Sequence, residues 1–397
     1  MPFAAKCYHA PRLQPLQSTD EIPVFKPLLE REEIAASEEA LRMGWLGPGA
    51  YVGRFEQALA EFFGAPDRHV VAVSTGHAAI HLALLRMGVG PGDEVVTPAF
   101  NNIADFQAIR ATGAEPVFCD VDPHTLCIDP DSAQRMIGPK TKVLIAMDYA
   151  CHVCDHDRIQ ALAAARGLRV LHDAAHALGS RHKGRKIGSF SDIATFSFDP
   201  VKTITTIDGG ALVVKSEEDV RWLREARLIG MGQPAEVMYR NQRAWTYDVA
   251  HIGFRYHLAN LHAALGLAQL EKFGRIERTR RAAARRYSEG LAGIDGLVLP
   301  ESDFADVVPF MYYVRLPPAR RDAFKAHLKS RGVDTGLHWQ PGHWFGYFRD
   351  CRRDELPVTE KIAREIVSIP FHSEMPEAWI ERVIAGIRGF FDAGARA

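Results

Sequence analysis

The chain has 397 residues, of which 47% are hydrophobic and 24% are charged, and its formal net charge is −1 at pH 7. This composition is typical of a folded soluble protein, and the length favours two domains over one. A nearly neutral chain has no overall field to attract nucleic acid or an anionic membrane, and no window approaches 18 uninterrupted apolar residues, so neither partner is expected.

The first segment, MPFAAKCYHAPRLQPLQSTD (1–20), lacks the charged and then apolar pattern of a signal peptide. We therefore expect a cytoplasmic protein whose six cysteines are reduced thiols. Residues 1–25 are interpreted as an N-terminal extension that precedes the first domain.

From residue 69 onward, short β-branched runs alternate with helix-like segments. Strands are expected at 69–74, 93–99, 115–122, 142–149 and 168–176, and helices at 77–88, 101–113, 131–138 and 157–167. This rhythm predicts an α/β fold with a mainly parallel sheet that helices cover on both faces. Ligands of such sheets bind outside the carboxyl ends of the strands.

The pattern changes near residue 262, where one long amphipathic stretch runs to residue 294. A strand at 311–317 and helices at 320–332 and 378–391 follow, which is enough for a small α+β domain. We expect a large domain at 26–275 and a small C-terminal domain at 276–397.

The segment CHVCDHD (151–157) contains a C-x-x-C spacing, Cys151 and Cys154, with His152 and His156 nearby. This spacing would suit half of a zinc site or a redox pair. Because no second C-x-x-C or H-x-x-x-H pair accompanies it, we interpret the segment as a turn after a strand and predict no metal site.

Polar residues follow three of the expected strands. In STGHAA (74–79), Gly76 permits a tight turn before a helix whose free N–H groups would suit a phosphate. Asp173 follows an apolar pair, where a carboxylate needs a cation or a donor. In FSFDPVKTITTIDGG (196–210), Ser197 precedes Lys202, which lies between two segments that do not look like surface. Each feature alone has a simpler explanation, namely an ordinary turn, a helix N-cap and a solvent-facing lysine.

Together these three features predict pyridoxal phosphate (PLP), which requires a phosphate site, an acid for its ring nitrogen and a lysine amine. Lys202 would form a Schiff base with the cofactor and then act as the catalytic base that moves the substrate proton. Surroundings of low polarity would lower its pKa. Asp173 would keep the pyridine nitrogen protonated.

The order of the motifs resembles the DegT/StrS family of PLP-dependent sugar aminotransferases, which have the aspartate-aminotransferase fold (fold type I). The resemblance runs from about residue 22 to the C-terminus. The motifs that carry it are GWLGPGAYVGRFEQALAEFFGA (44–65), STGHAAIHLALL (74–85), GPGDEVVTPAF (90–100), VFCDVDP (117–123), HDAAHALGS (172–180), FSFDPVKTITTIDGGALVV (196–214), HLANLHAALGLAQLEK (257–272), GVDTGLHWQPGH (332–343) and SIPFH (368–372).

The resemblance implies a homodimer with shared active sites, in which PLP and its amine form, PMP, carry an amino group. The group would pass from an amino acid, usually glutamate, to the keto group of a nucleotide-linked sugar. The cofactor-binding positions that it implies are Thr75, Gly76, His77, Asn102, Asp173, His176, Ser197 and, from the other subunit, Arg255. The substrate-binding positions that it implies are His338, Trp339 and His343.

Several positions depart from the family pattern. His77 stands where a hydroxyl residue is usual, Asn102 where an aromatic ring stacks on the cofactor, and Arg255 where an asparagine reaches the phosphate. Two alternatives stay open: a PLP enzyme that aminates a sugar without a nucleotide or a carbocyclic ketone, and a PLP-binding regulatory protein without turnover. A nicotinamide site is disfavoured, because STGHAA lacks the G-x-G-x-x-G spacing.

Overall fold

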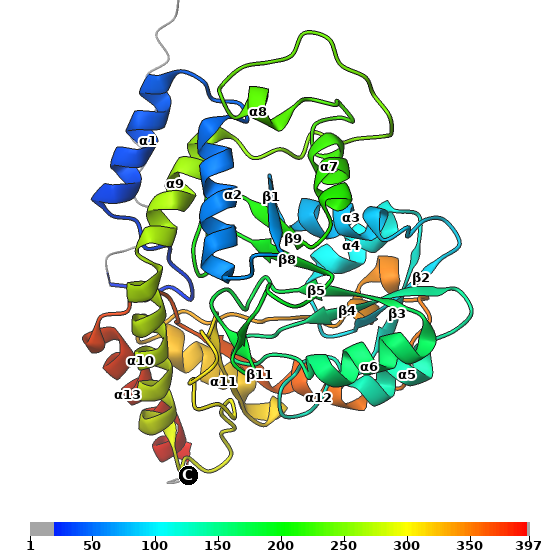
Figure 1. Ribbon diagram of the computed structural model, residues 1–397. Helices are drawn as coiled ribbons and strands as arrows, with labels where there is room; N and C mark the ends of the chain where they lie inside the picture. The colour runs from blue at the N-terminus through cyan, green and yellow to red at the C-terminus, as the bar shows by residue number, and fades with distance from the viewer. Residues whose placement is uncertain (1–19, 395–397) are drawn as a thin grey trace, which may run out of the picture.

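The computed structural model describes residues 20–394, so most of the predicted N-terminal extension (residues 1–19) and residues 395–397 lie outside the described part. A seven-stranded sheet occupies the middle of the molecule, and a two-stranded sheet lies in the C-terminal part (Figure 1). The large sheet consists of β1 (His69–Val73), β2 (Glu94–Pro98), β3 (Glu115–Cys119), β4 (Thr141–Met147), β5 (Arg169–Asp173), β8 (Ile193–Ser197) and β9 (Gly210–Val214).

The strand order is β1-β9-β8-β5-β4-β2-β3. The pairs β3/β2, β2/β4, β4/β5 and β5/β8 are parallel, and only β9 runs against its two neighbours. The prediction of an α/β fold with a mainly parallel sheet is therefore confirmed. The carboxyl ends of six strands meet at one edge, which is where such sheets bind ligands.

Helices cover both faces of the sheet, as the alternation of side chains along β1 shows. Val70 and Ala72 pack with Phe55 of α2, whereas Val71 and Val73 pack with the helices of the opposite face. The first face carries α2 (Ala50–Phe63), α5 (Pro130–Met136), α6 (His156–Arg166) and α9 (Asn260–Glu271), and the second carries α3 (Gly76–Arg86), α4 (Ile103–Ala111) and α7 (Glu217–Ala226). Strands buried on both faces are expected to be rich in apolar residues, as β1, β4 and β9 are.

The C-terminal part forms its own hydrophobic cluster around the antiparallel pair β10 (Tyr312–Arg315) and β11 (Ile366–Ile369). Its helices are α10 (Phe273–Leu291), α11 (Pro318–Lys329), α12 (Pro357–Glu365) and α13 (Glu377–Gly394), with short 3₁₀ turns η1 (Gly342–Trp344) and η2 (Gly346–Phe348). Ile22, which we assigned to the extension, bridges to Val333 of this part. The division of the chain into a large and a small domain between residues 275 and 276 remains a proposal. It is compatible with the start of α10 at Phe273, three residues before the proposed start of the small domain.

The stretch 262–294 is divided rather than continuous, contrary to our interpretation. Lys272 ends α9 and precedes α10 with φ −93° and ψ 7°, so the helical path is interrupted at this residue. Its Nζ pairs with Glu30 and Glu33 at the start of α1 (Arg31–Met43). The interruption therefore positions a lysine against the first helix, which the amphipathic pattern alone does not reveal.

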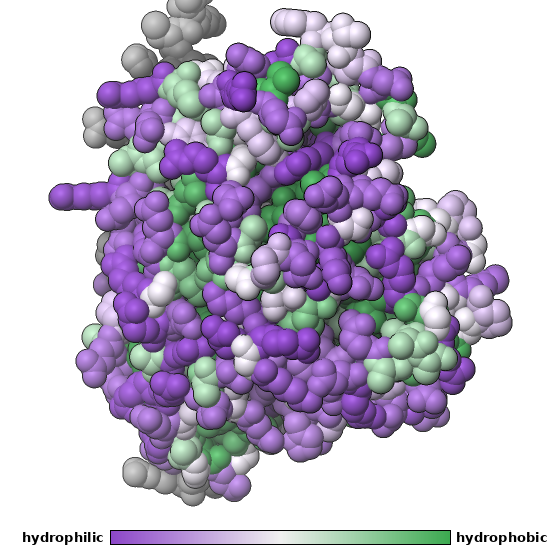
Figure 2. Space-filling view, in the orientation of Figure 1, coloured by the Kyte–Doolittle hydropathy of each residue, from purple (hydrophilic) through white to green (hydrophobic). Residues whose placement is uncertain are grey.

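The outer surface is mostly polar. Figure 2 shows hydrophilic side chains over most of the visible face, with hydrophobic residues in the recesses between them. None of the described helices is long and apolar enough to cross a membrane. The remaining elements are the short hairpin β6 (Arg181–His182) and β7 (Arg185–Lys186) and the helix α8 (Ala235–Met238).

A buried ion pair joins α2 to β1 and to the end of α7. Glu56 Oε1 accepts the backbone N–H of Ala72 at 2.9 Å and lies 2.5 Å from Arg227 Nη1. Arg227 also donates to the carbonyl oxygen of Ala72 at 2.5 Å. Both side chains are almost completely buried, so neither charge has water as an alternative partner.

We expect Glu56→Gln to reduce the free energy of unfolding by ~3 kcal/mol, because it leaves the Arg227 cation buried without its counter-ion. Urea denaturation followed by circular dichroism measures the change. Glu38→Gln is the matched control, since its pair with Arg42 is exposed and contributes little. Equal effects of the two substitutions would contradict a stabilising role for the buried pair.

Candidate active site

A cavity of about 430 Å³ opens at the carboxyl ends of β1, β5 and β8. It is lined by eight of the positions predicted for catalysis and cofactor binding, namely Thr75, Gly76, His77, Asn102, Asp173, His176, Ser197 and Lys202. The ends of strands that are distant in sequence thus converge on one space, as the parallel topology predicts.

Lys202 lies in the loop that leaves β8. Its backbone N–H donates to the Asp199 carbonyl oxygen at 3.0 Å, which folds the loop back toward the sheet edge. The Nζ atom lies 4.5 Å from the centre of the Phe310 ring. Burial lowers the pKa of Lys202 to about 8, and the charge of Asp173 only partly opposes this shift. Roughly a tenth of the amine is therefore neutral at pH 7, far more than for an ordinary lysine.

Asp173 is the last residue of β5 and is buried. Burial raises its pKa to about 6, although the Ala175 N–H and the charge of Lys202 act in the opposite direction. The Ala175 N–H donates to Oδ1 at 2.9 Å. A buried carboxylate with a single backbone donor retains a strong affinity for a proton or a cation.

His176 presents a hydrogen-bond donor without a partner. The backbone N–H of Ala150 donates to Nδ1 at 3.3 Å, so the ring proton belongs on Nε2. Nε2 is buried and has no hydrogen-bond partner among the described residues. The ring stacks against Phe310 at 4.0 Å and Trp339 at 5.1 Å between centroids, which fixes its plane. Burial and the nearby Lys202 hold the pKa of His176 well below its usual value, so the ring is neutral.

The turn after β1 closes the other end of the cavity. Thr75 caps α3 by accepting the Ala78 N–H at 2.9 Å. A Cβ atom on Gly76 would lie 2.7 Å from the Cβ of Ser197, so only glycine lets the turn approach the end of β8 this closely. The free N–H groups of the α3 terminus therefore lie beside the Ser197 side chain, as an anion site requires.

The residues His77 and Asn102 connect α3 to α4. Nδ1 of His77 lies 3.1 Å from the Ala104 carbonyl oxygen, to which it donates. The Asn102 side chain accepts the Ala104 N–H at 2.9 Å and caps α4. Both side chains line the cavity while also holding the helix ends, and their contact with a cofactor remains a proposal.

These residues fit pyridoxal phosphate. A single cavity contains an amine with a lowered pKa, a buried carboxylate and a neutral N–H donor without a partner. It also contains a helix N-terminus, where a glycine allows the turn to approach the end of β8 closely. They match the aldehyde, the ring nitrogen, the ring oxygen and the phosphate of this cofactor, one group each.

Four predicted positions do not line this cavity. Arg255 lines a different hollow with Trp45 and Tyr247. Trp339 reaches the site only through its stack on His176, and the preceding His338 is held by Ser368 Oγ at 2.8 Å. His343 Nε2 lies 3.3 Å from Glu360 of α12, and His343 is not among the residues that line the cavity.

Sequence reasoning overlooked several neighbours of the site. Phe310, the ring beneath Lys202, comes from the C-terminal part and follows no recognisable motif. Asp148 and Tyr149 directly follow β4, so the rule that polar strand ends form sites would have identified them.

The two cysteines of the C-x-x-C spacing interact with different partners. The thiols of Cys151 and Cys154 donate to the carbonyl groups of Met311 and Met147, respectively.

Comparisons with known proteins show which family the chain is similar to. The model of the DegT/DnrJ/EryC1/StrS aminotransferase family matches residues 27–388. The crystal structure of the aminotransferase TlmJ from Streptoalloteichus hindustanus is 34% identical, with a TM-score of 0.87 over 94% of this chain and 100% of that one. DesV from S. venezuelae is 31% identical, with a TM-score of 0.83 over 93% and 99%. The PMP form of Spr1654 from Streptococcus pneumoniae is 26% identical, with a TM-score of 0.87 over 94% and 99%.

The lowered pKa of Lys202 predicts a pH dependence that can be measured on the protein freed of cofactor. Only the neutral amine attacks an aldehyde, so we expect the rate of PLP incorporation to rise with pH and to level off above about 8. Stopped-flow absorption measures the rate, and peptide mapping after borohydride reduction identifies the lysine. A rate that still rises tenfold per unit above pH 9 would show an ordinary lysine pKa.

Proposed function

The chain belongs to the DegT/DnrJ/EryC1/StrS aminotransferase family and is a PLP-dependent sugar aminotransferase, and from this premise we propose that it transfers an amino group from glutamate to the keto group of a nucleotide-linked sugar. The observation that carries the mechanism is the convergence of Lys202, Asp173 and His176 on one cavity. We further propose that the reaction takes place in the cytoplasm.

Lys202 holds and moves the proton. Bound pyridoxal phosphate supplies an aldehyde that takes up an amino group and a ring that accepts the electron pair released at the substrate Cα. When its amine is free, Lys202 would take the proton from the substrate Cα and deliver it to the carbon that carried the cofactor aldehyde. Its lowered pKa suits this role, since the amine is then neutral in an appreciable fraction of molecules near neutral pH.

Asp173 and His176 set the charge of the ring. Asp173, with its raised pKa, pairs with the protonated ring nitrogen. The Nε2–H of His176 donates to the ring oxygen, which satisfies a donor that is otherwise buried without a partner. Phe310 and Trp339, stacked on either side of His176, exclude water from this end of the cavity.

A groove outside the cavity supports the proposal that the substrate carries a nucleotide. It is lined by Trp45, Asn241, Arg243 and Trp245, and the Arg243 guanidinium lies 5.8 Å from the centre of the Trp45 ring. Aromatic faces stack on a base, and guanidinium groups bind phosphate in pairs of hydrogen bonds. We propose that His338, Trp339 and His343 contact the sugar side of the substrate.

Exposed apolar residues around this groove support a homodimer. Trp245 is 91% exposed and Ile252 is 83% exposed, which is uncommon for large hydrophobic side chains grouped on one loop. Arg255 follows in the same segment and does not line the cavity of its own chain. We propose that this segment covers the partner's cavity, where Arg255 would pair with the phosphate of the cofactor.

We expect Lys202→Ala to lower the turnover of glutamate and a nucleotide-linked keto-sugar by at least ~10³-fold, because the proton has no other base of suitable pKa. Mass spectrometry of the sugar product measures turnover, and absorption shows whether cofactor is bound. Lys215→Ala is the matched control, since this exposed lysine lies at the end of β9 away from the cavity.

The same assay separates the alternatives. Equal turnover of the sugar without its nucleotide would remove the nucleotide from the proposal. Turnover only with carbocyclic ketones would show that the protein is a PLP enzyme that aminates these ketones instead of a nucleotide-linked sugar. Bound cofactor that reacts with no amine would identify a regulatory protein without turnover.

A mixing experiment tests whether Arg255 acts across a dimer. We expect Lys202→Ala and Arg255→Ala proteins, each deficient at limiting PLP, to regain up to about a quarter of wild-type activity after joint refolding, because hybrid dimers contain one intact site. Size-exclusion chromatography with light scattering measures the mass. A monomer, or hybrids without a gain in activity, would contradict the shared site.

A further inference from the structure

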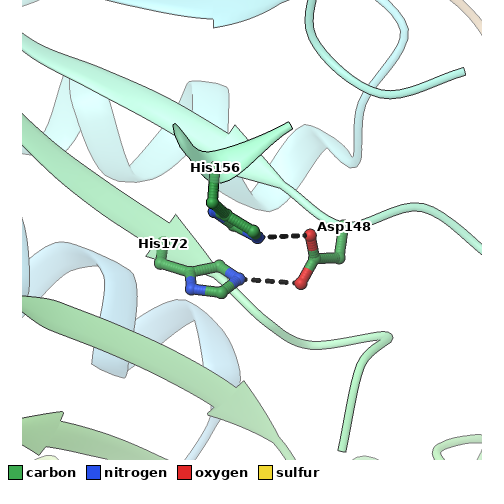
Figure 3. A group of neighbouring side chains, drawn as sticks. All are labelled: Asp148, His156 and His172. Atoms are coloured by element: carbon green, nitrogen blue, oxygen red, sulfur yellow. Dashed lines mark hydrogen bonds and ion pairs between the residues drawn. The ribbon is translucent and has the colours of Figure 1, made fainter. Parts of the chain in front are cut away.

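A buried group of three ionisable side chains lies behind the active-site edge of the sheet, outside the cavity. It consists of Asp148, directly after β4, His156 at the start of α6, and His172 in β5 (Figure 3). Asp148 Oδ1 lies 2.9 Å from Nε2 of His156, and Oδ2 lies 2.7 Å from Nε2 of His172. The backbone N–H of Cys154 donates to Oδ1 at 2.8 Å. All three side chains are at most 1% exposed.

The geometry defines where the protons lie. A carboxylate only accepts, so both Nε2 atoms donate to Asp148. Nδ1 of His172 then accepts the hydroxyl proton of Ser191 at 2.8 Å. Nδ1 of His156 is buried without a partner, which a neutral ring tolerates because only a lone pair is left unsatisfied. Burial lowers the pKa of His172, so its ring is neutral. A second proton on His156, at Nδ1, would have no acceptor among the described residues, so the hydrogen bonds favour a group that carries the charge of Asp148.

The same three residue types would suit a metal ion, but the donor set favours hydrogen bonds. Metal bound to both Nε2 atoms would move the ring proton of His156 to Nδ1. Because Nδ1 has no acceptor within the described chain, this would leave a buried N–H donor unsatisfied. The hydrogen-bonded arrangement avoids that cost, so we interpret the group as a buried anion with three donors.

This anion is linked to Asp173 in two ways. The backbone N–H of Asp148 donates to the carbonyl oxygen of Asp173 at 3.1 Å, where the ends of β4 and β5 pair. His172 immediately precedes Asp173, and alternation along a strand places the two side chains on opposite faces of the sheet. Burial is the largest cause of the raised pKa of Asp173, and the charge of Asp148 adds to it.

We propose that Asp148 is a positioning residue whose buried negative charge makes Asp173 and the cofactor ring nitrogen retain their shared proton. Loss of that proton would leave two carboxylates ionised in a nearly dry region, which like-charge repulsion opposes. The two histidines keep Asp148 ionised: burial raises its pKa, but its interactions with His172 and His156, including a hydrogen bond from each Nε2–H, outweigh burial and hold the pKa well below its usual value. The inference rests on the proposed pairing of Asp173 with the ring nitrogen.

The other charged groups around Asp173 do not replace Asp148. Lys202, from the loop after β8, is a cation when protonated and lowers the proton affinity of Asp173. Asp105 of α4 is buried, and burial together with the charge of Asp173 raises its pKa well above the usual value, which disfavours a negative charge on it. His176 is neutral for the reasons given above. Asp148 is thus the anion that these elements present to Asp173.

The surroundings of Asp148 contain two further titratable groups. The Cys154 thiol has a pKa raised well above its usual value, chiefly by burial, and stays neutral. His182 of β6 stacks edge-on against His156, with 5.3 Å between the ring centroids, and lies 3.4 Å from the half-exposed Asp157. Neither supplies a positive charge in contact with the Asp148 carboxylate.

The proposal is tested on holoenzyme reconstituted with PLP labelled with ¹⁵N in the ring. We expect Asp148→Asn to shift the loss of the ring-nitrogen proton, followed by the ¹⁵N chemical shift, to a pH lower by about one unit or more. Asp120→Asn is the matched control, a buried carboxylate that caps α12 instead. A titration equal to that of the wild type would overturn the proposal.

Asp173→Asn distinguishes this inference from its premise. If Asp173→Asn leaves the titration of the ring nitrogen unchanged, the proposed pairing of Asp173 with that nitrogen itself fails. If it removes the proton while Asp148→Asn has no effect, only the role of Asp148 fails.

A measurement on the wild-type protein does not depend on how the variant folds. Long-range ¹H–¹⁵N spectra of labelled histidine are expected to show the ring proton of His156 and of His172 on Nε2, and the His172 ring as neutral between pH 6 and 8. A cationic ring at either position would neutralise Asp148 and overturn the proposal. Stoichiometric metal in elemental analysis of the holoenzyme would overturn it as well.

Discussion

The structure depends on ionisable groups that the fold forces into a poorly hydrated space at the carboxyl ends of parallel strands. Burial moves the pKa of Lys202 down to about 8 and that of Asp173 up to about 6, so each group approaches neutrality and each is made reactive by the same cause. Neither shift needs an unusual residue. Both follow from strands β5 and β8 being adjacent, parallel and covered on both faces.

The cavity needs both parts of the chain. The large sheet supplies the amine, the carboxylate and the turn at Gly76, whereas Phe310 of the C-terminal part provides the ring against which Lys202 and His176 pack. The main chain of this segment is fixed on both sides: the N–H of Phe310 donates to the Ala150 carbonyl oxygen, and Arg280 of α10 donates to the Phe310 carbonyl oxygen. Movement between the two parts would therefore change the environment of the catalytic amine directly.

Local sequence patterns were sufficient to predict the fold class and four residues that line the cavity, whereas the other four predicted lining residues followed from the family resemblance. Strands followed by Gly76, Asp173 and Lys202 carry this information within a few residues of each strand end, and the parallel topology brings the ends together. The contribution of Phe310 depends on tertiary packing and has no local signature. The ion pairs of Lys272, at the interruption between α9 and α10, likewise involve Glu30 and Glu33, which are more than 200 residues away. Arg255 lines a different hollow of its own chain, so the contact with the cofactor that the family pattern implies for it depends on a second subunit.

The group around Asp148 shows why residues that look ordinary in the sequence gain importance in the structure. His156 belongs to a segment that reads as an incomplete metal motif, and His172 reads as one residue of an apolar strand. Folding places both against one buried carboxylate, so the question of metal binding that the sequence raises becomes a question of charge balance. At the ring end of the cavity, Asp148 and Asp173 bring two potential negative charges, and Lys202 brings one potential positive charge. A protonated ring nitrogen would supply the second, which explains why an extra buried anion favours the protonated cofactor instead of destabilising the site.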